Sequence, residues 1–398
     1  MRSRGMSIRQ CGHKTDWSNI YSTLSEAARD NRPVTGWTHN FYRYPARFSP
    51  GFAAAAIQCL STPSDLILDP YMGGGTTVVE AIVAGRPVIG NDLNSLAAFI
   101  TRAKITTLAP REVAALKAWA TDAVPEFTYS TSAEELAHII DVDKAKNLSL
   151  VRARFIKKAI AAALASITGL PTTNAMNFAK CATLRVGQWA LDGRERHTSL
   201  KDFRQRLSAT TLEMVSAISS FERHRNKSRD AIILNEDASQ IDHSPVFQNG
   251  MRKASLVITS PPYPGVHVLY HRWQVDGRRE TPAPYWIAGC QDGNGASFYN
   301  FGDRRETAAD KYFLTSLKTL FAIRRIIRDG AFMVQMLAFN KPEDQLPRYL
   351  QNMERAGFAE VRLGKPRIWR AVPHRKWHAN LIGNTDAANE VVLIHQAI

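Results

Sequence analysis

The sequence predicts an α/β protein with a mostly parallel, twisted sheet that is interrupted by a long helical insertion. A strand, a glycine-rich turn, a helix and a second strand follow one another over residues 66–91, an order typical of parallel sheets. Strand signals then nearly vanish over residues 109–230 and return afterwards. Because a span of that length needs structure of its own, we expect helices inserted between two halves of one α/β domain, residues 1–108 and 231–398.

The expected elements follow this plan along the chain. The first half is predicted to hold helices at residues 17–28, 51–60 and 76–84 and strands at residues 66–69 and 87–90. The insertion is predicted to hold helices at residues 110–124, 133–140, 150–167 and 201–225. The second half is predicted to hold strands at residues 231–234, 255–259 and 331–337, helices at residues 310–328 and 345–356, and a closing antiparallel pair at residues 360–363 and 391–395.

Charge is the most informative feature of the composition. The chain has 51 lysine and arginine residues against 36 aspartate and glutamate residues, a formal net charge of +15. An excess of this size over a folded, non-repetitive chain favours a polyanionic partner such as nucleic acid, without distinguishing DNA from RNA.

The cysteines and the apolar runs argue against other classes of protein. Cys11, Cys59, Cys181 and Cys290 are far apart and form no CxxC pair, which argues against a zinc ribbon or a disulfide framework. No apolar run is long enough for a transmembrane helix, and the first residues lack the apolar core of a signal peptide. We therefore expect a cytoplasmic protein that binds neither a membrane nor a metal.

A glycine-rich turn joins the first predicted strand to the helix that follows it. Residues 69–77 read D-P-Y-M-G-G-G-T-T, and Asp92 stands at the end of the next strand. Glycines at such a turn let the backbone approach a ligand, and a carboxylate at the second strand end can accept both hydroxyls of an adenosine ribose. The loop is not GxGxxG and has no Walker lysine, so a dinucleotide or ATP is less favoured. The alternative is a tight turn in an ordinary α/β protein.

This loop resembles the D-P-(aromatic)-x-G-x-G-T-T motif of the S-adenosylmethionine (SAM)-dependent DNA amino-methyltransferases. The resemblance implies a Rossmann-like class I SAM-methyltransferase fold, with SAM lying across the carboxyl ends of the strands. It also implies that Asp92 holds the ribose and that Leu93 flanks the adenine. The other residues of this motif that the resemblance places at the cofactor are Asp69, Pro70, Gly73, Gly75, Thr76 and Thr77.

Two further segments resemble parts of the cofactor site in this family. Residues 43–48, R-Y-P-A-R-F, resemble a Y-P-A-(K/R)-F segment that packs beside the methionine part of SAM, which makes Pro45 and Phe48 the expected wall. Asp237 follows the strand at residues 231–234, where the family often places an acid against the amino group of the adenine. The alternatives are a structural loop and a surface turn.

A proline-rich turn directly follows the strand at residues 255–258. Ser260, Pro261, Pro262 and Tyr263 resemble the family's catalytic motif, (D/N/S)-P-P-(Y/F/W). The amino nitrogen of a base is a poor nucleophile because its lone pair is delocalised, and acceptors around its hydrogens favour the pyramidal form that attacks a methyl group. The serine oxygen and the first proline carbonyl can supply these acceptors, and the tyrosine offers a face for an extruded base. The alternative is a plain proline turn.

The first residue of the turn bears on the choice of base. In this family a serine there is associated more with N4 of cytosine and an aspartate with N6 of adenine, so Ser260 favours cytosine. Methylation at C5 of cytosine is not expected, because no cysteine follows a proline. The glycine loop precedes the catalytic turn here, whereas many serine-type members have the reverse order, which keeps adenine open.

Aromatic and basic residues alternate in two segments that we expect to contact nucleic acid. Cations neutralise phosphates and aromatic rings stack on bases. The candidates are Arg272, Trp273, Arg370, Arg375 and Lys376. The helical insertion is a candidate target-recognition domain, since basic residues gather at residues 152–158. For all of these, core aromatics and solvated charges are the alternative.

These observations together predict a site-specific DNA methyltransferase. It would act on double-stranded DNA, transferring a methyl group from SAM to an exocyclic amino nitrogen, first of all N4 of cytosine, by base flipping and direct transfer. The family resemblance also suggests a cognate restriction endonuclease as a partner. The alternatives are an N6-adenine DNA methyltransferase, an RNA amino-methyltransferase with the same site, and a catalytically silent nucleic-acid-binding protein.

Overall fold

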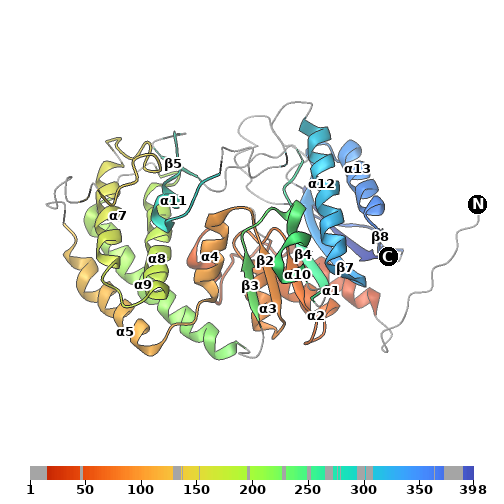
Figure 1. The fold of residues 1–398 in the computed structure, drawn as a ribbon, viewed down its shortest axis with the longest axis horizontal. Coiled ribbons are helices and arrows are strands. Elements are labelled where there is room, and N and C mark those ends of the chain that lie inside the picture. The colour runs from red at the N-terminus through yellow and green to blue at the C-terminus, as the bar shows by residue number, and fades with distance from the viewer. Residues whose placement is uncertain are drawn as a thin grey trace, which may run out of the picture.

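A mixed sheet with helices on both faces forms one half of the molecule (Figure 1). The computed structural model describes residues 16–44, 48–128, 136, 138–151, 153–194, 198–225, 230–248, 252–264, 272–275, 277, 279–293, 301, 308–362, 364–371 and 389–398. The strands of this sheet are β1 (Ile67–Asp69), β2 (Val88–Asn91), β3 (Ala231–Leu234), β4 (Ala254–Thr259), β7 (Ile327–Ala338), β8 (Phe358–Glu360), β9 (Ile368–Ala371) and β10 (Asn389–Ala397).

The strand order confirms the fold class predicted from the sequence. The order is β3-β2-β1-β4-β7-β10-β8, with β9 pairing β10 off this path. The first five strands run parallel, whereas β10 runs antiparallel to β7, β8 and β9. This is a Rossmann-like α/β sheet with one reversed strand near its edge, and its ligand site is expected at the carboxyl ends of the parallel strands.

Successive residues of the strands bury their side chains on opposite faces of the sheet. Ile67 packs with α1 (Trp17–Arg29), α2 (Pro50–Leu60), α3 (Thr76–Val83) and α4 (Ser95–Ile105), and Leu68 belongs to a second apolar cluster. That second cluster is built with α12 (Ala308–Arg325) and α13 (Pro342–Arg355). The alternation follows from the period of two along a strand, and it explains why β1 and β4 are mostly apolar on both faces.

The other half of the molecule is helical (Figure 1). Its helices are α5 (Pro110–Ala118), α7 (Arg154–Ile167), α8 (Thr173–Leu191) and α9 (Leu200–His224), with short helical turns at Trp119–Ala123 and Val124–Glu126. A hairpin of β5 (Trp273–Val275) and β6 (Arg279–Thr281), together with α11 (Ala283–Ala288), packs on α8. We call these elements the helical half. It therefore draws on chain from beyond residue 230 as well as from residues 109–230.

Side chains from the two halves join at several hydrogen bonds. Tyr42 lies after the short helix His39–Phe41, and its hydroxyl accepts from Nε1 of Trp273 at 2.9 Å. The amide of Gln188 on α8 donates to the carbonyl of Arg43 at 3.0 Å. Tyr285 on α11 donates to Oδ1 of Asn94, the residue before α4, at 2.9 Å. Within the described ranges, the helices include none that is long and apolar enough to cross a membrane.

Candidate active site

The glycine-rich turn lies at the carboxyl end of β1 and leads directly into α3. Gly73 and Gly75 adopt positive φ angles of 49° and 74°, which L side chains rarely adopt. The amide of Met72 donates to the carbonyl of Asn91 at the end of β2, at 2.9 Å. The turn is thereby held against the neighbouring strand at the carboxyl edge of the sheet.

Three side chains that the sequence analysis did not single out support this turn from below. A Cβ added to Gly75 would lie 2.6 Å from Oγ1 of Thr101, and one added to Gly74 would lie 2.9 Å from Cβ of Tyr44. Lys104 is fully buried, and its ammonium donates to the carbonyl of Gly74 at 2.5 Å. Thr101 and Lys104 lie one turn apart on α4, a spacing that becomes a signal only once α4 is known to pack against the loop.

Asp92 closes the turn on the β2 side. Its carboxylate accepts from the amide of Gly73 at 2.8 Å and from the amide of Asn94 at 2.8 Å. Burial raises the pKa of Asp92 to about 6, and the two amides act in the opposite direction. The side chain of Asn235, after β3, donates to the carbonyls of Asp92 and Leu93 at 2.7 Å and 3.0 Å. The acid is thus placed by backbone groups on both sides.

These groups fit the SAM that the family resemblance implies. Gly75 precedes α3 and, among the described residues, no side chain caps that helix, so its first-turn amides can receive an anionic group such as a carboxylate. Asp92 offers acceptors of the kind that ribose hydroxyls need. We expect the amides at the start of α3 and the carboxylate of Asp92 to hold the two ends of the cofactor.

Asp69 links the glycine turn to the catalytic turn. It is 1% exposed, and its carboxylate accepts from the hydroxyls of Thr77 at 2.6 Å and Thr259 at 2.7 Å and from the amide of Tyr71 at 3.2 Å. Burial raises the pKa of Asp69 to about 7, against the lowering effect of these donors. Because β1 and β4 are neighbours, one buried acid ties together two motifs that lie 190 residues apart.

The predicted catalytic turn follows β4 at the same edge of the sheet. Oγ of Ser260 lies 3.0 Å from the hydroxyl of Tyr263, which donates to Oε1 of Glu390 at 2.9 Å. The carbonyl of Pro262 accepts from the hydroxyl of Tyr312 on α12 at 2.8 Å. Pro261 is buried. The backbone and side chains of the turn are therefore fixed by partners from α12 and β10.

The remaining predicted cofactor residues differ in their placement. Thr76 and Pro70 are buried within the glycine turn, and Leu93 is partly buried beside Asp92. Phe48 is 6% exposed and packs edge-on against Phe52 of α2, with ring centroids 5.7 Å apart. Asp237 is exposed and caps the short helix Ala238–His243 by accepting from the amide of Ser239 at 2.8 Å. Pro45 lies outside the described residues.

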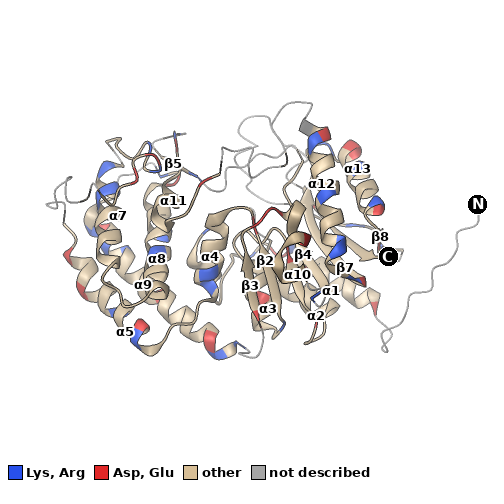
Figure 2. Ribbon diagram, viewed as in Figure 1, with Lys and Arg blue, Asp and Glu red and all other residues tan. Residues whose placement is uncertain are grey.

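Of the predicted nucleic-acid residues that the structure describes, Trp273 and Arg370 are taken up inside the protein, whereas Arg272 is partly exposed. Trp273 is 1% exposed and faces Gly187 of α8. Arg370 pairs with Glu390 at 2.5 Å, and Arg272 pairs with Asp292 at 3.0 Å. Arg375 and Lys376 lie outside the described residues. Other lysine and arginine residues lie on α4, α7, α8 and α12 (Figure 2).

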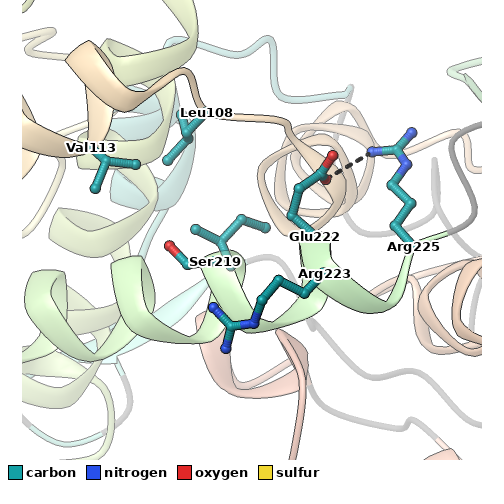
Figure 3. Close-up of a pocket in the computed structure, with 7 residues that line it drawn as sticks. Leu108, Val113, Ser219, Glu222, Arg223 and Arg225 are labelled. Atoms are coloured by element: carbon teal, nitrogen blue, oxygen red, sulfur yellow. Dashed lines mark ion pairs between the residues drawn. The ribbon is translucent and has the colours of Figure 1, made fainter.

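Two cavities lie away from the catalytic turn. One of about 430 Å³ sits where the end of α9 meets the segment before α5, and there Glu222 and Arg225 form an ion pair at 3.8 Å (Figure 3). The other, of about 380 Å³, lies between α4 and α8 and includes Lys180, Arg102 and Asn235. Among the described residues, no cluster of histidine, cysteine and acidic side chains is suited to a metal ion.

Comparison with known proteins finds similarity in the part of the chain that holds the glycine turn. A family model described as DNA methylase matches residues 4–101, which include the glycine turn and Asp92. Type II methyltransferase M.MvaI of Kocuria varians is 30% identical over 106 residues, 24% of this chain and 23% of that protein. Type II methyltransferase M.MjaII of Methanocaldococcus jannaschii is 31% identical over 94 residues, 24% of this chain and 17% of that protein.

In these comparisons the chain is similar to DNA methylases and to type II methyltransferases. The match nevertheless spans less than a quarter of the length of either curated relative. Solved structures that resemble this chain include TrmN from Thermus thermophilus, with a TM-score of 0.34, 12% identity and coverage of 90% of this chain and 52% of that chain. They also include the rRNA methyltransferase aviRa from Streptomyces viridochromogenes, with a TM-score of 0.28, 12% identity and coverage of 84% and 86%.

Proposed function

We propose that the protein is a SAM-dependent DNA methyltransferase that modifies an exocyclic amino nitrogen, with N4 of cytosine as the preferred target. The observation that carries this proposal is the link through Asp69, whose carboxylate accepts from Thr77 of the glycine turn and from Thr259 beside Ser260. A binding protein without activity has no need to couple these two turns. The relatives named type II methyltransferases support DNA over RNA as the substrate.

SAM supplies an activated methyl group on a positively charged sulfur. The protein's own part is to present the amino nitrogen in a reactive form. Oγ of Ser260 and the carbonyl of Pro261 accept the two amino hydrogens, which localises the nitrogen lone pair. The ring of Tyr263 stacks on the extruded base, and the fixed turn holds the nitrogen in line with the methyl group. The reaction needs no covalent intermediate.

The helical half is proposed to recognise the target sequence, and Arg272, Arg375 and Lys376 are proposed to contact the phosphates. Trp273 and Arg370 are left out of this surface because both side chains are taken up inside the protein. A restriction endonuclease of the same specificity is proposed as a functional partner, as the family resemblance suggests.

Nucleoside mass spectrometry tests the proposal. Purified protein and labelled SAM are incubated with unmethylated genomic DNA or with structured RNA, and the digested nucleosides are identified. We expect N4-methylcytosine from the DNA, its loss in Ser260→Ala and Tyr263→Ala, and no change in Ser64→Ala, which alters an exposed serine. N6-methyladenine would retain the mechanism and change the base. A methylated nucleoside from RNA alone, or none at all despite SAM binding, would refute DNA methylation.

A further inference from the structure

A chain of hydrogen bonds runs from the catalytic turn to the last strand of the sheet. Oγ of Ser260 lies 3.0 Å from the hydroxyl of Tyr263, which lies 2.9 Å from Oε1 of Glu390. The second carboxylate oxygen of Glu390 accepts from Nη2 and Nε of Arg370 at 2.5 Å and 2.7 Å. Arg370 also donates to the carbonyl of Ala28 at the end of α1, at 3.2 Å. The catalytic turn, β10, β9 and α1 are thus linked to Ser260 in one series of hydrogen bonds.

The far end of this chain is fixed by the sheet. Glu390 and Arg370 are directly opposite each other on β10 and β9. Their side chains are 3% and 10% exposed, so the pair is shielded from water. An arginine that binds one carboxylate oxygen through two donors keeps the orientation of Glu390 constant. Oε1 of Glu390 therefore faces Tyr263 as the acceptor of its hydroxyl hydrogen.

That constraint determines the direction of every bond in the chain. A tyrosine hydroxyl has one hydrogen, and here it must go to the carboxylate of Glu390. Toward Ser260 the same oxygen can then only accept, so the serine hydrogen points at Tyr263. The oxygen of Ser260 is left with its lone pairs directed elsewhere, ready to accept a hydrogen bond. An isolated serine would donate or accept with equal ease.

We propose that Glu390, braced by Arg370 and acting through the hydroxyl of Tyr263, is a positioning residue that sets Ser260 as an acceptor for the amino group of the target base. The inference rests on the proposed function and deepens it. In this proposal the hydroxyl of Tyr263 orients Ser260, whereas its ring stacks on the base. A phenylalanine in place of Tyr263 would keep the ring and lose this control of polarity.

Kinetics of three variants test the inference, with Glu360→Gln as the matched control. Glu360, at the end of β8, forms a similar pair at 2.7 Å with Arg367, the residue before β9. We expect Tyr263→Phe and Glu390→Gln each to lower kcat by about 10-fold to 100-fold while KM for DNA and the Kd of SAM stay within about 2-fold. The double variant should be no slower than the slower single variant, because both remove the same chain. Glu360→Gln should match the wild type.

A spectroscopic measurement checks the same chain without any reaction. Protein labelled with carbon-13 at Cζ of tyrosine gives a signal for Tyr263 that is assigned by its absence in Tyr263→Phe. Recorded without SAM or DNA, this signal should shift in Glu390→Gln and stay in place in Glu360→Gln. An unmoved signal in Glu390→Gln, or an undiminished kcat in Tyr263→Phe, would overturn the inference. A wild type that leaves DNA unmethylated would instead refute the proposed function.

Discussion

Different kinds of contact stabilise the carboxyl edge of the sheet and the interior of the helical half. At the sheet edge, buried polar side chains such as Asp69, Thr77 and Thr259 bond to one another in fixed directions. In the helical half, the buried positions of α7 and α8 are mostly small or aliphatic, as at Ala159, Ile160 and Ala179. Directional bonds determine where a reacting atom can sit, whereas apolar packing tolerates exchange of similar volumes. Substitutions at the edge should therefore change chemistry, and those in the helical half should change stability first.

Removal of Asp69 is expected to have the largest effect on stability. In Asp69→Ala the hydroxyls of Thr77 and Thr259 lose their buried acceptor, which should lower the free energy of unfolding by about 3 kcal/mol. Urea unfolding measures the difference. Asp329→Ala, which breaks a pair with Arg324 at the surface, serves as control and should stay within about 0.5 kcal/mol of the wild type. Equal losses of unfolding free energy in the two variants would contradict the greater importance of the buried bonds at the sheet edge.

The same acid predicts a pH dependence of stability. Because burial raises the pKa of Asp69 from 3.8 to about 7, its contribution is fully present below pH 3.8 and is lost as the pH rises through 7. Asp69→Asn should therefore flatten the decline in unfolding free energy between about pH 4 and pH 7. Urea midpoints across this range measure it, and a decline of the same slope in Asp69→Asn would show that another group is responsible.

Comparing alanine substitutions at two glycines distinguishes the cost of backbone strain from the cost of steric crowding. Gly75 and Gly193 have φ angles of 74° and 62°, but only at Gly75 would a Cβ meet a neighbour, Oγ1 of Thr101 at 2.6 Å. Gly193→Ala should cost about 1 kcal/mol for its φ angle alone. Gly75→Ala should cost about twice that or more and weaken SAM binding, because the turn must shift. Unfolding and calorimetric titration with SAM measure both, and equal effects on SAM affinity would contradict the placement of the cofactor.

SAM affinity should depend on pH through Asp92. A protonated carboxyl group is a poorer acceptor for ribose hydroxyls, and burial raises the pKa of Asp92 to about 6. Protons then compete with SAM, so the Kd should be constant above pH 7 and rise toward about 10-fold per unit below pH 6. Asp92→Asn should bind weakly and without this dependence. Affinity that follows pH identically in wild type and Asp92→Asn would rule out the assigned role.

The smallest effect is expected at the junction with the helical half. Trp273→Phe keeps an aromatic ring but loses the bond from Nε1 to Tyr42, at a cost of about 1 kcal/mol. SAM affinity should not change, since the contacts of Trp273 with Tyr42 and Gly187 lie outside both turns of the sheet edge. Adding Tyr42→Phe should cost little more, because the same bond is already gone. A large loss of SAM affinity in Trp273→Phe would mean that the two halves are coupled more tightly than their contacts indicate.

The sheet edge was more accessible to sequence analysis than the helical half. Apolar runs that end in a glycine turn and a proline turn predict the strands at residues 66–69 and 255–259. In both turns the residues expected to act are contiguous in the sequence. The long helix α8 was not predicted. It lies at the centre of the helical half and is buried on several sides, so it lacks the polar face that marks an amphipathic helix.

Long-range contacts were the second feature that the sequence could not predict. The alternation of aromatic and basic residues at Arg272 and Trp273 gave no indication that the tryptophan turns inward onto Gly187. Glu390 and Lys104 are single charged residues in unremarkable sequence, and only the fold brings them to Tyr263 and Gly74. A pattern of residue types specifies a local turn, but the partner that orients it is set by tertiary structure.

A single-turnover measurement tests the assignment of the catalytic turn most directly. Protein saturated with labelled SAM and unmethylated DNA is mixed and quenched at short times, and methyl transfer is followed in wild type and Ser260→Ala. We predict that Ser260→Ala slows the transfer step by about 100-fold to 1,000-fold with unchanged affinities for SAM and DNA. Transfer at the wild-type rate in Ser260→Ala would contradict the assignment of this turn as the site of amino methylation.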